Sequence, residues 1–156
     1  MDANFREKLI AHCSKLIQEK LDQIQLSMDL AQDSLVNDTK SSAGDKYETS
    51  REMIQQDLDR LQKQLSEAKR DQQTLQSIID LPAYSDKEAK HARLGSLVTT
   101  EVGVYFLGVG LGKVVCEGQT IFAISLQSPI GKLILGKQQG ESFSFQQGTQ
   151  TIKALV

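Results

Sequence analysis

Apolar residues recur at alternating steps of four and three along most of the first 82 residues, and this spacing constrains the fold more than any other feature of the sequence. The period is that of a coiled-coil seam, because it keeps one stripe of a helix facing a partner helix. The first stripe consists of Leu9, Cys13, Ile17, Leu21, Ile24, Met28, Ala31 and Leu35. The second consists of Ile54, Leu58, Leu61, Leu65, Ala68, Leu75 and Ile79, with polar Gln72 in place of one apolar residue. The sequence therefore predicts two long helices.

A short segment, residues 39–44, separates the two stripes and is rich in small and polar residues. Because the stripes are nearly equal in length, we expect the helices to pair within one chain as an antiparallel coiled-coil hairpin. Each arm would be roughly 45–50 Å long at 1.5 Å per residue. Pro82 cannot continue a helix, so the hairpin is expected to cover residues 1–82. A coiled coil that joins two chains is the alternative, because periodicity alone does not distinguish the two.

The tip of the expected hairpin carries two carboxylates, in the segment Gly44-Asp45-Lys46-Tyr47-Glu48. Asp45 and Glu48 are three residues apart, so on a helix they are neighbours on one side. Side chains at the end of an isolated hairpin gain little from packing, which favours a use for this pair outside the fold. Asp45 is also suited to cap the second helix, and a helix start of this kind needs no further function.

After the hairpin the composition changes, which indicates a linker at residues 83–94 and a second domain at residues 95–156. Ten of the eleven glycines lie from Gly95 onward, and short β-branched or aromatic runs replace the helical period. The expected strands are Ser96–Thr100, Val104–Val109, Lys113–Cys116, Ile121–Ser125, Ser142–Gln146 and Thr151–Leu155. The second domain is therefore predicted to be rich in sheet.

One short helix is expected within this domain, between Ser128 and Gly136. Ser128 is a good N-cap, Pro129 suits the first helical position, and Gly136 can adopt the left-handed conformation that follows many helices. The chain is therefore predicted to have an α+β fold: a helical hairpin followed by an antiparallel sheet with one covering helix.

The formal net charge of −2 is divided unevenly, since residues 1–82 hold 15 acids and 11 bases and residues 83–156 hold 5 acids and 7 bases. Neither half shows the cluster of Lys and Arg that autonomous binding to a DNA duplex usually needs. No apolar run approaches the ~20 residues of a membrane span, and the N-terminus lacks the pattern of a secretion signal. We therefore expect an intracellular protein that binds neither membranes nor DNA by itself.

Other candidate sites in the sequence are weak. Cys13 lies on a helical stripe and Cys116 in a strand-like run, so both are predicted to be small buried residues in a reducing compartment. The run Gly108–Lys113 lacks the spacing of a phosphate-binding loop and a following helix, so a turn between strands is expected. The absence of Trp and the few aromatic residues disfavour a peptidyl-prolyl isomerase site.

Three segments carry motifs that are recognisable together. The first is the acidic tip Gly44-Asp45-Lys46-Tyr47-Glu48, the second is Leu94–Thr99, and the third is Ile124–Lys137 followed by Gly140-Glu141. In this order, and over nearly the whole chain, they resemble the Gly-Asp-x-x-Glu tip, the domain entry and the Ser-Pro-Ile helix of the Gre transcript-cleavage factors of bacterial RNA polymerase. The third segment is the most specific match.

The resemblance implies a coiled-coil hairpin followed by a domain of the FK506-binding-protein type (FKBP-like). It implies that Ser128, Pro129, Ile130 and Gly131 lie near a surface that docks on bacterial RNA polymerase, with the hairpin in the secondary channel. Asp45 and Glu48 would then reach the polymerase active site, help to hold a second Mg²⁺ and orient a water that cleaves the backtracked RNA.

By the same resemblance the protein is an accessory factor and not an enzyme. The resemblance further implies that it has no cofactor of its own, shares Mg²⁺ with the polymerase, meets the 3′ end of the nascent RNA only indirectly, and is a cytoplasmic monomer. After the tip the chain reads Thr49-Ser50-Arg51-Glu52-Met53, which departs from the family pattern. Two alternatives therefore stay open: a regulator that occupies the channel without cleavage, and a coiled-coil interaction module unrelated to transcription.

Overall fold

The computed structural model describes residues 1–38, 44–82, 84 and 90–156. The expected turn at 39–43 and residues 83 and 85–89 of the expected linker lie outside the described residues. The chain forms two compact units: the first joins Met1–Ser14 to Gln73–Val156, and the second is Lys15–Gln72. Both long helices therefore contribute residues to each unit.

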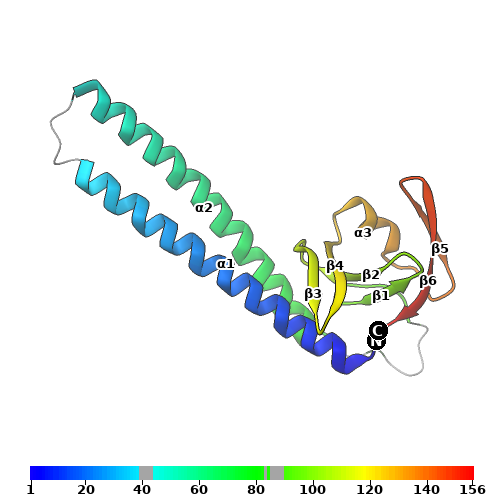
Figure 1. Cartoon of the computed structure of the whole chain (residues 1–156). Helices are drawn as coiled ribbons and strands as arrows, with labels where there is room; N and C mark the ends of the chain where they lie inside the picture. Colours follow the sequence, from blue (N-terminus) through cyan, green and yellow to red (C-terminus); the bar gives the residue numbers. More distant parts are fainter. Residues whose placement is uncertain (39–43, 83, 85–89) are drawn as a thin grey trace. The chain divides into compact units, whose positions relative to one another are not determined.

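Two long helices, α1 (Ala3–Asp38) and α2 (Gly44–Asp80), make up most of the N-terminal half of the chain (Figure 1). α1 begins after Asp2, whose carboxylate accepts a hydrogen bond of 2.8 Å from the Phe5 amide and so caps the helix. α2 ends shortly before Pro82, as expected for a residue that cannot continue a helix. In the part of the chain that the structure describes, no helix is long and apolar enough to cross a membrane.

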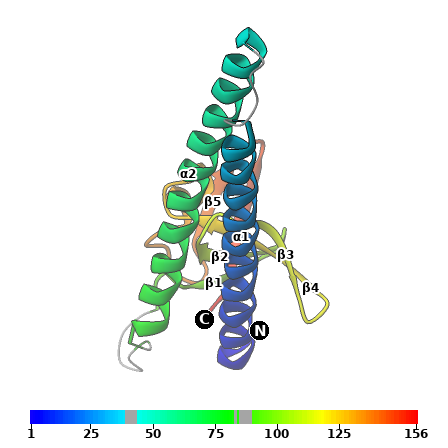
Figure 2. The ribbon, with the colours of Figure 1, turned by 90° about the vertical axis from the view of Figure 1, so that its left-hand side faces the viewer.

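In the second unit α1 and α2 run antiparallel and side by side (Figures 1 and 2). The seam is buried where the helices enter the unit, at Ile17, Leu21, Ile24, Leu61, Leu65 and Ala68. Farther along, the seam residues are only half-buried, namely Met28, Ala31, Leu35, Ile54 and Leu58. Burial in the hairpin thus decreases toward its tip, so packing contributes less to stability there.

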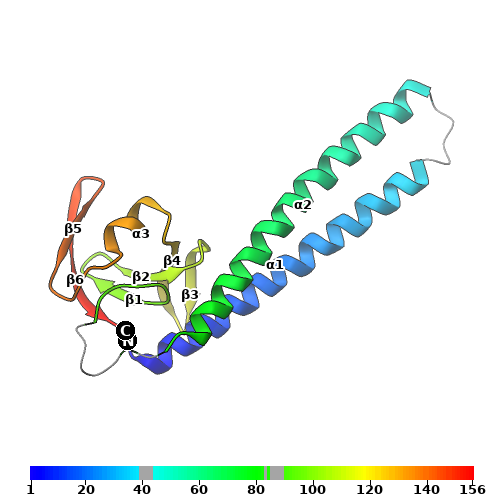
Figure 3. The same cartoon turned by 180° about the vertical axis from the view of Figure 1, so that it is seen from behind.

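The first unit contains a six-stranded sheet with the strand order β3-β4-β2-β1-β6-β5. The strands are β1 (Leu97–Thr100), β2 (Val104–Gly108), β3 (Gly112–Cys116), β4 (Gln119–Ser125), β5 (Ser142–Phe145) and β6 (Gly148–Leu155). The β5–β6 hairpin forms one edge of the sheet (Figure 3). All six expected strands are confirmed, with small differences at their ends.

One strand pair corrects the prediction of a purely antiparallel sheet. β2 and β4 are parallel, with Tyr105 opposite Phe122 and Leu107 opposite Ile124. The chain passes from β2 to the edge strand β3, reverses in the β3–β4 hairpin, and so returns in the direction of β2. The glycine-rich run provides the turn before β3, where Gly112 has a φ of +71° that favours glycine. The sheet is therefore mixed.

One face of the sheet is covered by the short helix α3 (Pro129–Ile134). Its buried residues Ile130 and Ile134 form one core with residues of the sheet and its surroundings, namely Ala92, Val98, Tyr105, Leu107, Phe143, Ile152 and Leu155. Side chains that alternate with these along the strands, such as Leu97 and Phe106, are also fully buried. The sheet is therefore packed on both faces.

Gln150 is a buried polar residue that joins three strands. Its Oε1 accepts a hydrogen bond of 2.9 Å from the Thr100 hydroxyl and one of 3.1 Å from the Tyr105 hydroxyl. These contacts connect β6 to β1 and β2 within the core, where an unpaired amide oxygen would be costly.

In the first unit, the last turn of α2 packs on the sheet through Ile78, which is 1% exposed. Gly95 and Gly108 make room for it, since a Cβ on either glycine would lie 2.8 Å from an Ile78 carbon. The seam pattern placed Ile79 at this position, but Ile79 is 54% exposed and that prediction is wrong. The contact falls one residue earlier because here the helix packs against a sheet, and the heptad period describes packing against another helix.

Both cysteines are free and buried, which confirms that they are buried residues and not a disulfide. Burial raises the pKa of the Cys13 thiol to about 11, and the neighbouring Cys116 adds to this shift. A thiol with a raised pKa stays protonated near neutral pH and is a poor nucleophile. The structure thus offers no support for thiol chemistry at Cys13.

The packing of α2 can be tested with two adjacent isoleucines. We expect Ile78→Ala to lower the free energy of unfolding by about 2–5 kcal/mol, because it leaves a cavity between the helix and two glycines. Ile79→Ala, the matched control, should change it by less than about 0.5 kcal/mol. Urea denaturation followed by circular dichroism measures both. A larger loss for Ile79→Ala than for Ile78→Ala would restore the heptad prediction.

Candidate functional site

The two tip carboxylates belong to the beginning of α2. The helix starts at Gly44, so Asp45 is a helical residue and not the residue that precedes the helix. Glu48 follows three residues later and is exposed to solvent. Positions three apart are neighbours on a helix surface, so the structure places positions 45 and 48 on one side of α2. The side chain of Asp45 lies outside the part of the structure that is described.

The start of a helix suits these two acids electrostatically. The unpaired amides of the first turn carry a partial positive charge, and nearby carboxylates are stabilised by it. This benefit does not require a ligand, so position alone does not make the tip a site. Among the residues searched in the described ranges, no group of three or more His, Cys, Asp or Glu could hold a metal ion.

The second predicted site lies at the start of α3, where Ser128 is the N-cap. Its backbone is extended, with φ −65° and ψ 153°, and its Oγ accepts a hydrogen bond of 3.1 Å from the Gly131 amide. The same hydroxyl donates a hydrogen bond of 2.7 Å to the Ser125 carbonyl. Pro129 follows in the first turn, where its missing amide hydrogen is no loss. The predicted cap is confirmed.

Gly131 and Ile130 are used within the fold. A Cβ on Gly131 would clash with the carbonyl oxygen of Ser125 and would lie 2.8 Å from the Ser128 hydroxyl. Ile130 is 8% exposed and belongs to the core beneath α3. The Ser-Pro-Ile-Gly pattern is thus explained by packing and capping, whether or not a partner contacts it.

The accessible side chains of this segment are different ones. Pro129 and Lys132 are exposed, and Leu133 and Leu135 are exposed by 37% and 46%. A protein that docks on α3 would meet these four residues first. A contribution to partner binding stays a prediction for Ser128, Pro129, Ile130 and Gly131. In that prediction Ser128 and Gly131 act indirectly, because they hold α3 in place.

Sequence reasoning gave no role to Arg6, Tyr84, Lys90 and Arg93, which line a common cavity in the first unit. They are far apart in the sequence, and no motif connects them. The sequence signal for this group was the pair of basic residues Lys90 and Arg93 shortly before Gly95. The charge count of residues 83–156 included them but did not single them out.

A scan of the sequence against protein-family models gives no match, and a search of curated proteins gives none either. Among solved structures, the chain is similar to that of the transcription factor Gfh1, with 18% sequence identity and a TM-score of 0.35. The match covers 91% of this chain and 92% of the other.

The role of Gly131 can be tested by adding one methyl group. We expect Gly131→Ala to lower the free energy of unfolding by about 1–3 kcal/mol, because the new Cβ must displace the Ser125 backbone. Gly148→Ala is the matched control, since a Cβ there meets no atom within 4 Å. Thermal and urea denaturation measure both. Equal stability of the two variants would contradict the proposed crowding around Gly131.

Proposed function

We propose that the protein is a Gre-like transcription factor that binds bacterial RNA polymerase through its secondary channel and stimulates cleavage of backtracked nascent RNA. The observation that carries this proposal is the position of Asp45 and Glu48 at the start of α2, at the tip of a helical hairpin. The order of the three motifs and the confirmed Ser128 cap support the same family. Under this proposal the protein acts in the cytoplasm.

A long, thin hairpin is suited to carry the two carboxylates at its tip into a narrow site. α2 has 37 residues and is therefore about 55 Å long, and burial of the seam decreases toward its first residues. A hairpin that is two helices wide enters openings that exclude a globular domain. We infer that side chains near the tip are little buried because they contact a partner and not the rest of the chain.

Asp45 and Glu48 fit an Mg²⁺ ion by their chemistry, because Mg²⁺ prefers oxygen ligands and keeps several waters. Two carboxylates are an incomplete set, so the polymerase must supply the remaining ligands. When bound, such an ion stabilises charge on the oxygens of the cleaved phosphodiester and activates a water. In this proposal the chain itself provides two oxygen ligands and their negative charge, and the polymerase is the enzyme.

The first unit would provide the docking surface. Leu133 of α3 and Leu135, the residue that follows α3, are exposed apolar side chains near the exposed Lys132. Exposed leucines that flank a lysine suit a partner surface with an apolar centre and an acidic rim. Rigid capping by Ser128 would hold this surface in one conformation.

A second candidate function is supported by the residues around the tip. Tyr47 stands between the two acids, and Thr49-Ser50-Arg51 follows them where the family resemblance is weakest. A factor with such a tip can occupy the channel and change initiation or pausing without cleavage. It would bind the polymerase as well as a cleavage factor does, so only the RNA product separates the two functions.

The deciding measurement is cleavage of RNA labelled upstream of its 3′ end in stalled, backtracked complexes of the cognate polymerase. We expect the wild-type protein to shorten the RNA, and the Asp45→Asn plus Glu48→Gln variant to reduce cleavage to the level without factor. The reason is that amides are neutral and bind Mg²⁺ poorly. The matched control is Asp57→Asn plus Asp59→Asn, which removes two exposed carboxylates elsewhere on α2 and should retain wild-type stimulation.

Other outcomes assign the protein differently. Binding to the polymerase without any RNA shortening favours the channel regulator. Equal activity of the Asp45/Glu48 variant and wild type would remove these residues from the mechanism. A stable dimer in light scattering, together with no capture of polymerase, would favour the interaction module.

Docking through α3 predicts a separate effect. We expect Leu133→Ser to weaken capture of polymerase about tenfold or less, because it removes part of one exposed apolar contact while leaving the tip intact. Val102→Ser is the control, since Val102 is 64% exposed and lies in the turn between β1 and β2. Surface plasmon resonance on immobilised polymerase measures both. Equal loss for the two variants would place the docking surface elsewhere.

A further inference from the structure

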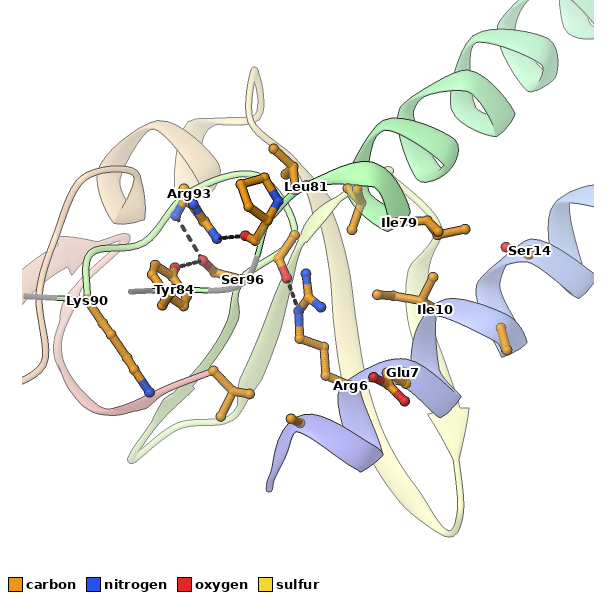
Figure 4. A pocket seen from close by; sticks show the side chains of 16 residues that line it. Arg6, Glu7, Ile10, Ser14, Ile79, Leu81, Tyr84, Lys90, Arg93 and Ser96 are labelled. Atoms are coloured by element: carbon orange, nitrogen blue, oxygen red, sulfur yellow. Dashed lines mark hydrogen bonds between the residues drawn. The ribbon is translucent and has the colours of Figure 1, made fainter. Parts of the chain in front are cut away.

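A cavity of about 590 Å³ lies entirely within the first unit. Its walls come from the first turns of α1, the last turn of α2 and described residues between α2 and β1, among them Tyr84, Lys90 and Arg93 (Figure 4). Its volume falls within the range of ordinary small-molecule sites. The proposed transcription function does not use this cavity.

Three basic side chains line the cavity: Arg6, Lys90 and Arg93. Arg93 lies over the ring of Tyr84, with its guanidinium carbon 4.1 Å from the ring centroid, and Lys90 lies 5.9 Å from the same centroid. In Figure 4 Arg6 lies between this cluster and the apolar residues Ile10 and Ile79. Among the described lining residues the acidic side chain is Glu7, so this described part of the lining carries an excess of positive charge.

Arg6 holds its charge in a poorly solvated position. Partial burial lowers the pKa of its guanidinium, and the nearby charge of Arg93 acts in the same direction, while Tyr84 and Glu7 oppose the shift. Its Nε donates a hydrogen bond of 2.6 Å to the Gly95 carbonyl. Within the described ranges, no ion pair involves Arg6, Lys90 or Arg93. An anion in the cavity would relieve this arrangement of like charges.

Among the described residues, each of the two guanidinium groups uses one of its N–H donors in a hydrogen bond. An arginine has five N–H donors. The structure pairs Arg6 through Nε with Gly95, and Arg93 through Nη2 with the Pro82 carbonyl at 2.6 Å. A purely structural role explains those two hydrogen bonds. It does not explain why two guanidinium groups and an ammonium group line one cavity.

The opposite part of the lining is apolar. Ile10 and Ile78 are buried, whereas Ile79 and Leu81 line the same cavity and are exposed by 54% and 36%. Covering such exposed aliphatic side chains with the apolar part of a ligand removes their surface from water, which favours binding. The exposure of Ile79, which the heptad pattern did not predict, thus has an explanation at this cavity.

We propose that this cavity binds a small organic anion, namely a carboxylate or phosphate ester with an apolar body. The anionic group would accept hydrogen bonds from Arg6 and lie near Lys90 and Arg93. The apolar body would lie against Ile10, Ile79 and Leu81. The proposal is independent of the proposed function, because its residues belong neither to the tip nor to α3.

The test uses the full-length protein with 1-naphthyl phosphate as the probe, 1-naphthol as its neutral analogue and inorganic phosphate as its polar part. We expect isothermal titration calorimetry to show binding of 1-naphthyl phosphate at least tenfold tighter than either analogue. In ¹H–¹⁵N spectra the largest shifts should lie at Arg6, Gly95 and Ser96, which border the cavity.

Substitutions then locate the site. Lys90→Gln, at an exposed position, should weaken binding about two- to fivefold, and Arg6→Gln should weaken it about tenfold or more. Ile79→Ala should weaken binding of the naphthyl compound without changing that of inorganic phosphate. Lys113→Gln is the control, because Lys113 is an exposed base on β3 outside the cavity, and it should bind as wild type does.

Three results would overturn the proposal. They are equal binding of 1-naphthol and 1-naphthyl phosphate, equal weakening by Lys113→Gln and Lys90→Gln, and no binding by the wild-type protein. If Arg6→Gln does not fold, Lys90→Gln and Ile79→Ala still decide the question, since both alter side chains with exposed surface.

Discussion

The first unit depends on the contact of the Ile78 side chain with Gly95 and Gly108. Gly95 and Gly108 have no side chains, so the last turn of α2 can approach the sheet closely enough to bury an entire isoleucine. Gly95 has a φ of +85°, a conformation that side chains rarely adopt, and its carbonyl also accepts the Arg6 hydrogen bond from α1. One glycine thus fixes the ends of both long helices. The last turn of α2 is thereby packed on the sheet, and Ile79 and Arg6 line a cavity beside it.

The hairpin in the second unit follows a different principle. Its seam is buried near the start of the unit and half-buried toward the tip, so stability decreases along the helices while the sequence retains heptad spacing. Met28 and Ile54, for example, are only half-buried. A helix can continue into such a region because its own hydrogen bonds and side-chain pairs contribute, such as Gln55 with Asp59 at 3.1 Å. Glu48, which is exposed near the start of α2, is therefore little constrained by packing, which makes its identity available for a function.

The sequence predicted the elements well because each has a local cause. Helical period, Pro82, the glycine turns and the Ser128 cap all act within a few residues, and the structure has two long helices, six strands and α3 where they were expected. The features that the sequence did not predict depend on tertiary contacts. The parallel pairing of β2 with β4 depends on where β3 lies in the sheet. The burial of Ile78 in place of Ile79 depends on two glycines distant in sequence, and the role of Gln150 depends on hydroxyls from two other strands.

The same distinction applies to function. The acids of the tip are recognisable from sequence because they form a local feature with a fixed spacing, whereas under the proposed function their use depends on ligands that a partner supplies. The residues of α3 were recognised as a motif, but capping and packing explain Gly131 and Ile130. These two residues therefore stabilise the conformation of α3 and are not themselves exposed for contact with a partner. The cavity beside Arg6 is the converse case. Its residues form no motif, and only the fold brings three cations and an apolar wall together in one place.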